Sequence, residues 1–262
     1  MGNLVIATPT WSDLATLTAS SELASAPVAN LQRMQPTDLF QAASSADFYL
    51  EADRGSAQPF NLVALLYTNV GGSGTWRVRA ADTQGGLTSS PPYDSGSLTF
   101  WASPNLDTWT RRHSLLWIPA GVTRRWVRID VGSVGATFQG GRLYIGQAWQ
   151  PSRNYQYGGG LGHVDLSPKT RANGLHTVPT AKPTLVQQDF QLDFLSEAEM
   201  YANLFELRRL RGATKDVLVC LNPDDTTYRH QAMCYGLLDW TERITRPAFK
   251  RFAQNFRIEE LV

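Results

Sequence analysis

Apolar and polar residues alternate in short stretches over residues 1–150. In the segment 75–80, Trp76, Val78 and Ala80 fall on one side of an extended chain, and the arginines between them fall on the other. This alternation is typical of a strand with one face buried and one in water. The same pattern predicts strands at 48–52, 62–67, 114–118, 125–131 and 142–147. Gaps rich in Gly, Ser, Pro, Asn and Asp separate them, so residues 1–152 are expected to form a sandwich of two packed sheets, with one barrel as the alternative.

The pattern stops between residues 153 and 183. Four glycines, at positions 158, 159, 160 and 162, are followed by prolines at 168, 179 and 183 among polar residues. The glycine run lacks the Lys-Ser/Thr pair of a phosphate-binding loop, and no helix pattern follows it. We therefore interpret 153–183 as a linker or an extended arm, with a hinge at the glycines.

Alternation resumes at residues 184–194 and leads into the one strong helix signal of the chain. Ser196 and Glu199 have the spacing of a capping box, in which each side chain bonds the other's backbone amide. The helix is predicted over 197–211, with three arginines in its last turn before Gly212.

A β-hairpin is predicted from 216–221 and 231–238, around the turn at 222–225, and a last strand from 249–261. Residues 184–262 therefore form a second small β-sandwich or barrel, covered by one helix. The fold class is mainly β, with two β-sandwich domains, the second carrying one flanking α-helix.

Composition narrows the classes of function. The 262 residues carry 24 Lys and Arg against 23 Asp and Glu, a net charge of +1, so the long-range positive field of a nucleic-acid binder is missing. The N-terminus lacks the basic and apolar regions of a signal peptide, and no segment has the ~20 apolar residues that span a membrane. We expect neither nucleic acid nor membrane insertion.

Residues that could carry chemistry are scattered. The histidines at 113, 163, 176 and 230 have no metal-ligand spacing, and no serine lies in a Gly-x-Ser-x-Gly elbow. Two cysteines, Cys220 and Cys234, are interpreted as buried thiols, with a cross-strand disulfide as the alternative. No cofactor and no metal are expected.

Acidic residues at positions 47, 51, 53 and 130 include the pair that a glycoside hydrolase would need. Glu51 and Asp53 share one face of a strand, and alternating charge on an outer face is the favoured explanation. The chain is therefore predicted not to be an enzyme.

Tryptophan is abundant, with eight residues. Trp101 and Trp109 lie in a loop-like stretch, where an exposed indole could stack on a sugar ring or enter a partner's pocket. The alternative is that both indoles lie under the loop as part of a small satellite core. These two residues are the candidate ligand contacts.

Seven segments of the first domain share a pattern with a known family: residues 20–22, 27–31, 48–52, 62–66, 76–79, 125–129 and 141–146. On these segments the domain resembles the galactose-binding-like, or discoidin-like, β-sandwich family as it occurs in phage tail proteins. The run 146–158 is similar to a junction in tailed-phage tail-tip proteins. No sugar ligand and no catalytic residue can be transferred from the family to this chain.

The second domain, with Leu195-Ser196-Glu197-Ala198-Glu199 after a long strand, resembles the sandwich shared by tail tube, distal tail and hub proteins. This resemblance implies a ring of three or six copies. We therefore expect a structural virion protein of the tail tip, assembled in the host cytoplasm, that joins the tail tube to the baseplate and contacts tube, hub and fibre proteins.

Within that ring, Tyr155, Tyr157, Gly158 and Gly160 are the candidate contacts of the arm. The alternative function is an adhesin of the tail tip that binds host-surface glycan through Trp101 and Trp109. A tail-associated hydrolase is a third and less favoured interpretation.

Overall fold

The computed structural model describes residues 2–102, 109, 112–171, 177–240 and 242–262. The chain divides into two units. The first comprises Met1–Gln150 with Cys220–Met233, and the second comprises Pro151–Val219 with Cys234–Val262. Each unit contains an antiparallel sheet. The second unit also contains one helix of 15 residues, at the position that the sequence predicts. The predicted fold class, mainly β with one helix, is confirmed.

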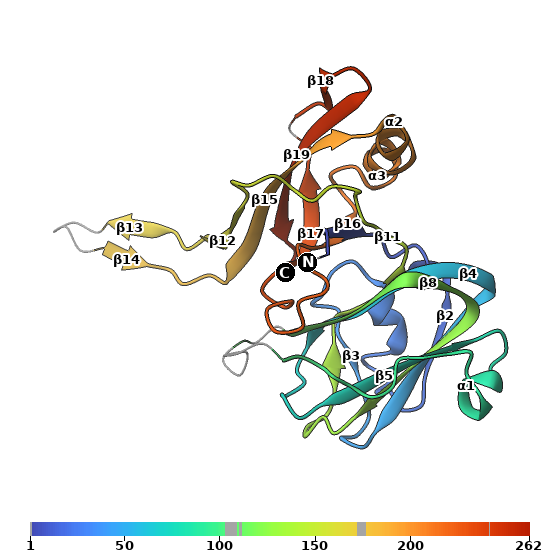
Figure 1. Ribbon diagram of the computed structural model, residues 1–262. Helices are drawn as coiled ribbons and strands as arrows, with labels where there is room; N and C mark the ends of the chain where they lie inside the picture. The colour runs from blue at the N-terminus through green and yellow to red at the C-terminus, as the bar shows by residue number, and fades with distance from the viewer. Residues whose placement is uncertain (1, 103–108, 110–111, 172–176, 241) are drawn as a thin grey trace. The chain divides into compact units, whose positions relative to one another are not determined.

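The first unit is built on one sheet that folds over on itself (Figure 1). Its strands run in the order β10-β4-β8-β5-β6, with β2 paired to β4 and β7 paired to β5. Their bounds are Thr16–Ala19 (β2), Phe48–Thr68 (β4), Thr75–Ala81 (β5), Tyr93–Asp94 (β6), Leu98–Thr99 (β7), Arg112–Gly132 (β8) and Arg142–Gly146 (β10).

Short elements complete the first unit. Two small strand pairs are β1 (Val5–Ala7) with β11 (Ala148–Trp149) and β3 (Phe40–Gln41) with β9 (Gln139–Gly140). The helical turns are η1 (Ser12–Leu14), η2 (Val28–Gln32) and α1 (Gly86–Ser89).

Two long strands, β4 and β8, differ from the sequence-based expectation. The segments 48–52 and 62–67 were expected as separate strands, but both belong to β4, and 114–118 and 125–131 both belong to β8. The β4–β8 register shifts in the middle of the pair, between Asp53 and Gln58 and again between Phe60 and Leu62. Gly55 and Gly121 adopt positive φ angles of 79° and 67° near these shifts, a conformation that residues with a Cβ rarely adopt.

The bend places both halves of the long strands around one core. Leu50 and Val63 come from opposite halves of β4, yet both belong to the same buried cluster. The predicted alternation on β8 is confirmed, because Val127, Ile129 and Val131 are each only 1 % exposed. The sheet therefore closes as a sandwich with an apolar interior.

The second unit contains a sheet with strand order β16-β17-β19-β15-β12, in which β18 pairs with β19. The bounds are Gly160–Asp165 (β12), Thr184–Leu195 (β15), Asp216–Cys220 (β16), Met233–Asp239 (β17), Thr245–Ala248 (β18) and Arg251–Glu260 (β19). Phe190 and Phe256 lie opposite each other on β15 and β19 with stacked rings 4.9 Å apart. The predicted last strand is confirmed, and Phe252, Phe256 and Ile258 form its buried face.

The helix of the second unit begins with the predicted capping box. Ser196 Oγ accepts the Glu199 amide at 3.2 Å, and Glu199 Oε2 accepts the Ser196 amide at 3.1 Å. The helix continues through α2 (Glu197–Glu199), a π-helical stretch (Met200–Phe205) and α3 (Glu206–Arg211). It ends at Gly212, whose φ of 52° allows the chain to turn away.

Residues 160–183 form a hairpin that continues into β15, within the stretch 153–183 that the sequence predicts as a linker or an extended arm. The inner half pairs β12 with the start of β15, from Gly160 opposite Asp189 to Asp165 opposite Thr184. The outer half pairs β13 (Lys169–Arg171) with β14 (Thr177–Pro179). Figure 1 shows this ladder running away from the rest of the sheet. We call residues 160–183 the arm.

Candidate functional site

The first unit contains a hollow of about 370 Å³ lined by both apolar and polar residues. That volume lies near the lower end of the ~300–1,000 Å³ typical of ligand pockets. The apolar lining residues are Trp76, Leu98, Phe100, Trp101, Ala102, Leu115, Leu116, Trp117, Pro119, Pro223 and Met233. The polar lining residues are Thr99, His113, Asp224, Thr226, Arg229 and His230. We call this hollow the tryptophan pocket.

Trp101 is one of the two predicted ligand contacts, and it lies in the wall of this pocket. Its indole Nε1 donates to the carbonyl oxygen of Val70 at 3.0 Å, and the guanidinium of Arg112 lies 5.6 Å from its ring centroid. The ring also covers Gly72, where an added Cβ would lie 3.3 Å from it. Trp101 is therefore a fixed, half-buried wall that presents part of its indole to the pocket.

Trp109, the other predicted contact, does not line the pocket but contacts a residue that does. Its ring meets the imidazole of His230 edge to face, with centroids 4.8 Å apart. Trp101 and Trp109 are thus brought to the same region, one in the wall and one behind it. Residues 103–108, which lie between them in the sequence, are outside the described residues.

Two histidines far apart in the sequence meet in the lining of the pocket. The backbone amide of His113 donates to Nδ1 of His230 at 3.1 Å, and Nδ1 of His113 accepts the amide of Tyr67 at 3.0 Å. The two imidazoles lie 5.0 Å apart. Because Nδ1 of His230 acts as an acceptor, the neutral ring carries its hydrogen on Nε2.

His230 is held neutral by its surroundings. Its side chain is 4 % exposed, and this burial lowers its pKa from the ordinary 6.5 to about 4, with the positive charge of Arg112 acting in the same direction. Among the described residues, Nε2 of His230 has no hydrogen-bond partner. The pocket wall therefore contains a buried, unsatisfied N–H donor.

Arg229 supplies the positive charge of the pocket. Its Nη1 donates to the carbonyl oxygen of Leu115 at 2.6 Å, while its Nε is buried without a partner among the described residues. Burial lowers the pKa of Arg229, and the charges of Asp224 and Asp225 oppose this effect. Neither aspartate forms an ion pair with Arg229 in the described part of the chain.

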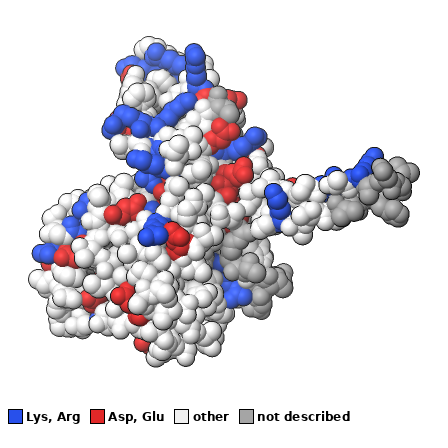
Figure 2. All heavy atoms as spheres, turned by 180° about the vertical axis from the view of Figure 1, so that it is seen from behind, with Lys and Arg blue, Asp and Glu red and all other residues white. Residues whose placement is uncertain are grey.

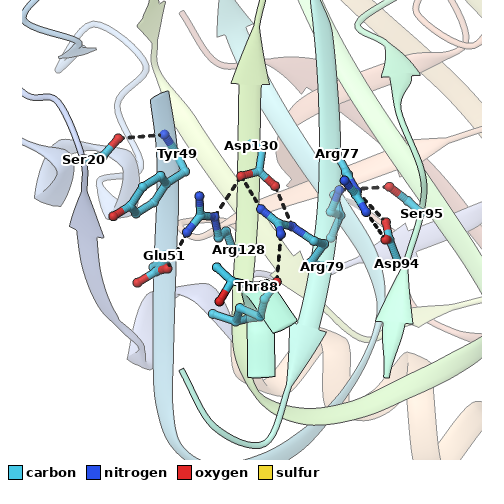
Figure 3. Close-up of polar contacts among 12 residues, drawn as sticks. Ser20, Tyr49, Glu51, Arg77, Arg79, Thr88, Asp94, Ser95, Arg128 and Asp130 are labelled. Carbon is cyan, nitrogen blue, oxygen red and sulfur yellow. Dashed lines mark hydrogen bonds and ion pairs between the residues drawn. The ribbon is translucent and has the colours of Figure 1, made fainter. Parts of the chain in front are cut away.

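A ladder of ion pairs lies on the outer face of β4, β8, β5 and β6 (Figure 3). Asp130 accepts from Arg79 at 2.6 and 2.8 Å and from Arg128 at 2.8 Å. Arg128 also reaches Glu51 at 3.2 Å, and its guanidinium lies 3.5 Å from the centroid of the Tyr49 ring. The ladder ties neighbouring strands together through their outer side chains.

The candidate carboxylates of a hydrolase lie in or beside this ladder. Asp53 is held by Arg125 through two bonds of 2.7 Å, which lower its pKa. Asp47 accepts the backbone amide of Ser133 at 3.0 Å. With Glu51 and Asp130 joined through Arg128, all four acids have structural partners, and Glu51 is only 5 % exposed.

The proposed arm contacts lie beside the base of the arm in the second unit. Tyr157 is fully exposed, and with Gly158 it borders a hollow of about 450 Å³ that Asp189 and Arg257 also line. Gly158 has a φ of 99° and turns the chain into β12, where Gly160 is the first residue. Tyr155 is half-buried.

Both cysteines are free thiols in the structure, so the alternative of a disulfide is wrong. Burial raises the pKa of Cys220 to about 12 and raises that of Cys234 as well. In the described ranges, no group of three or more His, Cys, Asp or Glu side chains is arranged to hold a metal ion. None of the helices formed by these residues is long and apolar enough to cross a membrane.

No protein-family model matches the chain, and no curated protein matches it. Solved structures similar to it include the family 32 carbohydrate-binding module of C. perfringens NanJ in complex with galactose, at 14% identity and a TM-score of 0.41, covering 54% of this chain and 98% of that one. The lectin domain of lectinolysin complexed with Lewis B antigen is similar at 10% identity and 0.39, covering 53% and 99%. SpGH29 is similar at 14% identity and 0.40, covering 53% of this chain and only 28% of the other. TM-scores this low carry no argument about function.

Proposed function

We propose that this chain is a non-enzymatic structural protein of a phage tail tip, in which the second unit joins several copies into a ring. The observation that carries the proposal is the arm. It is an exposed extension of the sheet, and a two-stranded ladder of this kind is marginally stable by itself in water. A neighbouring copy would supply the contacts that keep it ordered.

The composition of the arm supports this role. Leu161 and Leu166 are 52 % and 49 % exposed, and the described part of the arm has no buried residue. Strand β12 is at the edge of the sheet, and Asp165 is the only Asp, Glu, Lys or Arg residue in it. An edge with so few protecting charges and no proline is suited to pairing with another strand.

The distribution of charged side chains also supports docking of the arm on a neighbouring copy. Figure 2 shows basic side chains on the projecting arm, where the described Lys and Arg residues are Lys169, Arg171 and Lys182. Acidic groups line the hollow beside the base of the arm, where Asp189 is paired with Arg257 but Asp239 and Glu242 add further negative charge. A basic arm and an acidic receiving surface on the next copy would form a head-to-tail interface, which closes into a ring.

The virion setting follows from the sequence resemblance of 195–199 and 146–158 to tail-tip proteins. In that setting the ring would hold three or six copies between the tail tube and the baseplate, and would contact tube, hub and fibre proteins. The first unit would then be available to bind other molecules.

The test is the mass of the purified full chain. We expect light scattering to give an integer multiple of 29.1 kDa, three or six, and the double variant Leu161→Asn with Leu166→Asn to shift the mass to the monomer. Leu14→Asn is the control, since Leu14 is 66 % exposed and lies in the first unit. A native chain that is monomeric at every concentration would overturn the proposal.

Carbohydrate binding by the first unit is the second candidate function. It is supported by the tryptophan pocket, which combines indole surfaces with polar groups as sugar sites do. Trp101→Ala should abolish glycan-array binding, whereas Trp126→Ala, a half-buried tryptophan under Arg125, should leave it unchanged. Array binding that survives Trp101→Ala would count against this candidate.

A further inference from the structure

The tryptophan pocket contains two hydrogen-bond donors that the described part of the chain leaves unsatisfied. They are Nε of Arg229 and Nε2 of His230, and both are buried atoms. A buried donor without a partner is costly, and a largely buried cation without a carboxylate partner is more so. A ligand that brings acceptors and negative charge would satisfy both groups.

The rest of the pocket limits what that ligand can be. Trp101, Trp117 and Pro119 form flat, apolar surfaces, on which the carbon face of a ring can pack. Thr226 and Asp224 add a hydroxyl and a carboxylate to the lining, and these suit ligand hydroxyl groups. The volume of about 370 Å³ restricts the ligand to a small molecule or to the end of a chain.

We propose that this pocket binds a sugar that carries a carboxylate. The guanidinium of Arg229 and the Nε2–H of His230 donate to the carboxylate, while the ring of the sugar packs on the indoles of Trp101 and Trp117. This inference rests on the carbohydrate-binding candidate, and it adds the acidic class of ligand and the two residues that select it.

His230 suits this role because it is a neutral donor. Its Nδ1 is occupied by the amide of His113, so Nε2 keeps its hydrogen over the physiological range. Arg229 suits it because its Nη1 is anchored on the carbonyl of Leu115, which leaves Nε for the ligand. The donors come from a segment held close to β8 by these two bonds, and they are therefore positioned before the ligand arrives.

The experiment compares acidic sugars with matched neutral ones on the full chain, by calorimetry or ligand-observed NMR. The probes are glucuronic acid, its methyl ester, N-acetylneuraminic acid and galactose. We expect the acids to bind at least about tenfold more tightly than the ester and galactose, the difference typical of a charge-assisted hydrogen bond. Equal binding of acid and ester would overturn the acidic specificity and leave sugar binding standing.

Variants identify the donors. Arg229→Gln should weaken binding of glucuronic acid about tenfold or more and leave galactose unchanged, while Arg229→Lys, which keeps the charge but not the planar fork, should lose less. Arg33→Gln is the control, because Arg33 lies on the surface in an exposed pair with Asp38. Native affinity for the acid in a folded Arg229→Gln protein would contradict the assignment.

A measurement on the unmodified protein covers the case in which a variant does not fold. The ¹⁵N resonance of Nε2 of His230 should shift when glucuronic acid is added, and should shift less with its methyl ester at the same concentration, because the ester carbonyl is a weaker acceptor than a carboxylate. An unchanged Nε2 resonance with bound acid would remove His230 from the site. Failure of all four sugars to bind would reject both the acidic ligand and the carbohydrate-binding candidate, while the ring proposal is tested separately by mass.

Discussion

Protonation of His230 should destabilise the first unit at mildly acidic pH. Above pH 6.5 the imidazole is neutral in both the folded and the unfolded chain, so it has no effect on stability there. Between pH 6.5 and about 4 the unfolded chain binds a proton that the folded chain does not, because burial lowers the folded pKa to about 4. The free energy of unfolding therefore falls as the pH falls through this window.

The magnitude follows from the two pKa values. The ordinary value of 6.5 and the folded value of about 4 differ by about 2.5, and each pKa unit corresponds to ~1.36 kcal/mol. His230 should thus account for about 3 kcal/mol of lost stability by pH 4. Other groups titrate over the same range, so the quantity to measure is the difference between the native protein and His230→Asn.

Asparagine is the substitution of choice because its side-chain oxygen can still accept the His113 amide. Urea unfolding can be followed by tryptophan fluorescence, since Trp240 is the only tryptophan outside residues 1–150. We expect the stability difference between the two proteins to be constant above pH 6.5 and to shift by about 3 kcal/mol in favour of the variant by pH 4. Parallel stability profiles over the whole range would refute the reasoning.

Two further predictions concern the polar contacts of each unit. Ser196→Ala removes the capping box with Glu199 and should lower the stability of the second unit by about 1 kcal/mol, measured by urea unfolding followed through the far-UV circular dichroism of its helix; an unchanged midpoint would contradict this. Arg79→Met leaves Asp130 with one of its two arginines and should cost roughly 1–3 kcal/mol, whereas Arg33→Met should cost less than about 1, because its ion pair is exposed; equal losses would show that the ladder adds nothing.

The sequence predicts an element correctly where the alternation of apolar residues, or the capping residues, lie within that element. Val127, Ile129 and Val131 could be assigned to the core because one face of β8 is buried along its whole second half. The helix at 197–211 could be predicted to the residue, since Ser196 and Gly212 mark its ends chemically. In both cases the signal lies within a few residues of the structure it specifies.

The continuous strands and the arm could not be predicted in the same way. The middle of β4 is exposed and polar around Gly55, so it looks like a turn, although pairing with β8 resumes at Gln58 and β4 continues as one strand. In the arm, Gly160 and Gly162 carry no side chain that could alternate, and pairing with β15 alone defines the strand. Backbone hydrogen bonds between distant segments leave little trace in side-chain pattern.

The sequence predicts only some of the residues of the tryptophan pocket. Trp101 and Trp109 could be chosen as candidates because large aromatic residues are unusual in a polar loop. Arg229 and His230 were missed as ligand contacts, since they follow a turn more than 100 residues away in the chain. The segment 220–233, which contains the turn predicted at 222–225, belongs with the first unit. A single sequence carries no signal that predicts contact between segments so far apart in the chain.

The central proposal is that the arm joins copies of the chain. Native mass spectrometry tests it most directly, by comparing the unmodified protein with a variant in which a short Gly-Ser loop replaces residues 160–183. The account predicts one dominant species of three or six chains for the unmodified protein and a folded monomer for the shortened one. Identical masses for the two proteins would contradict it.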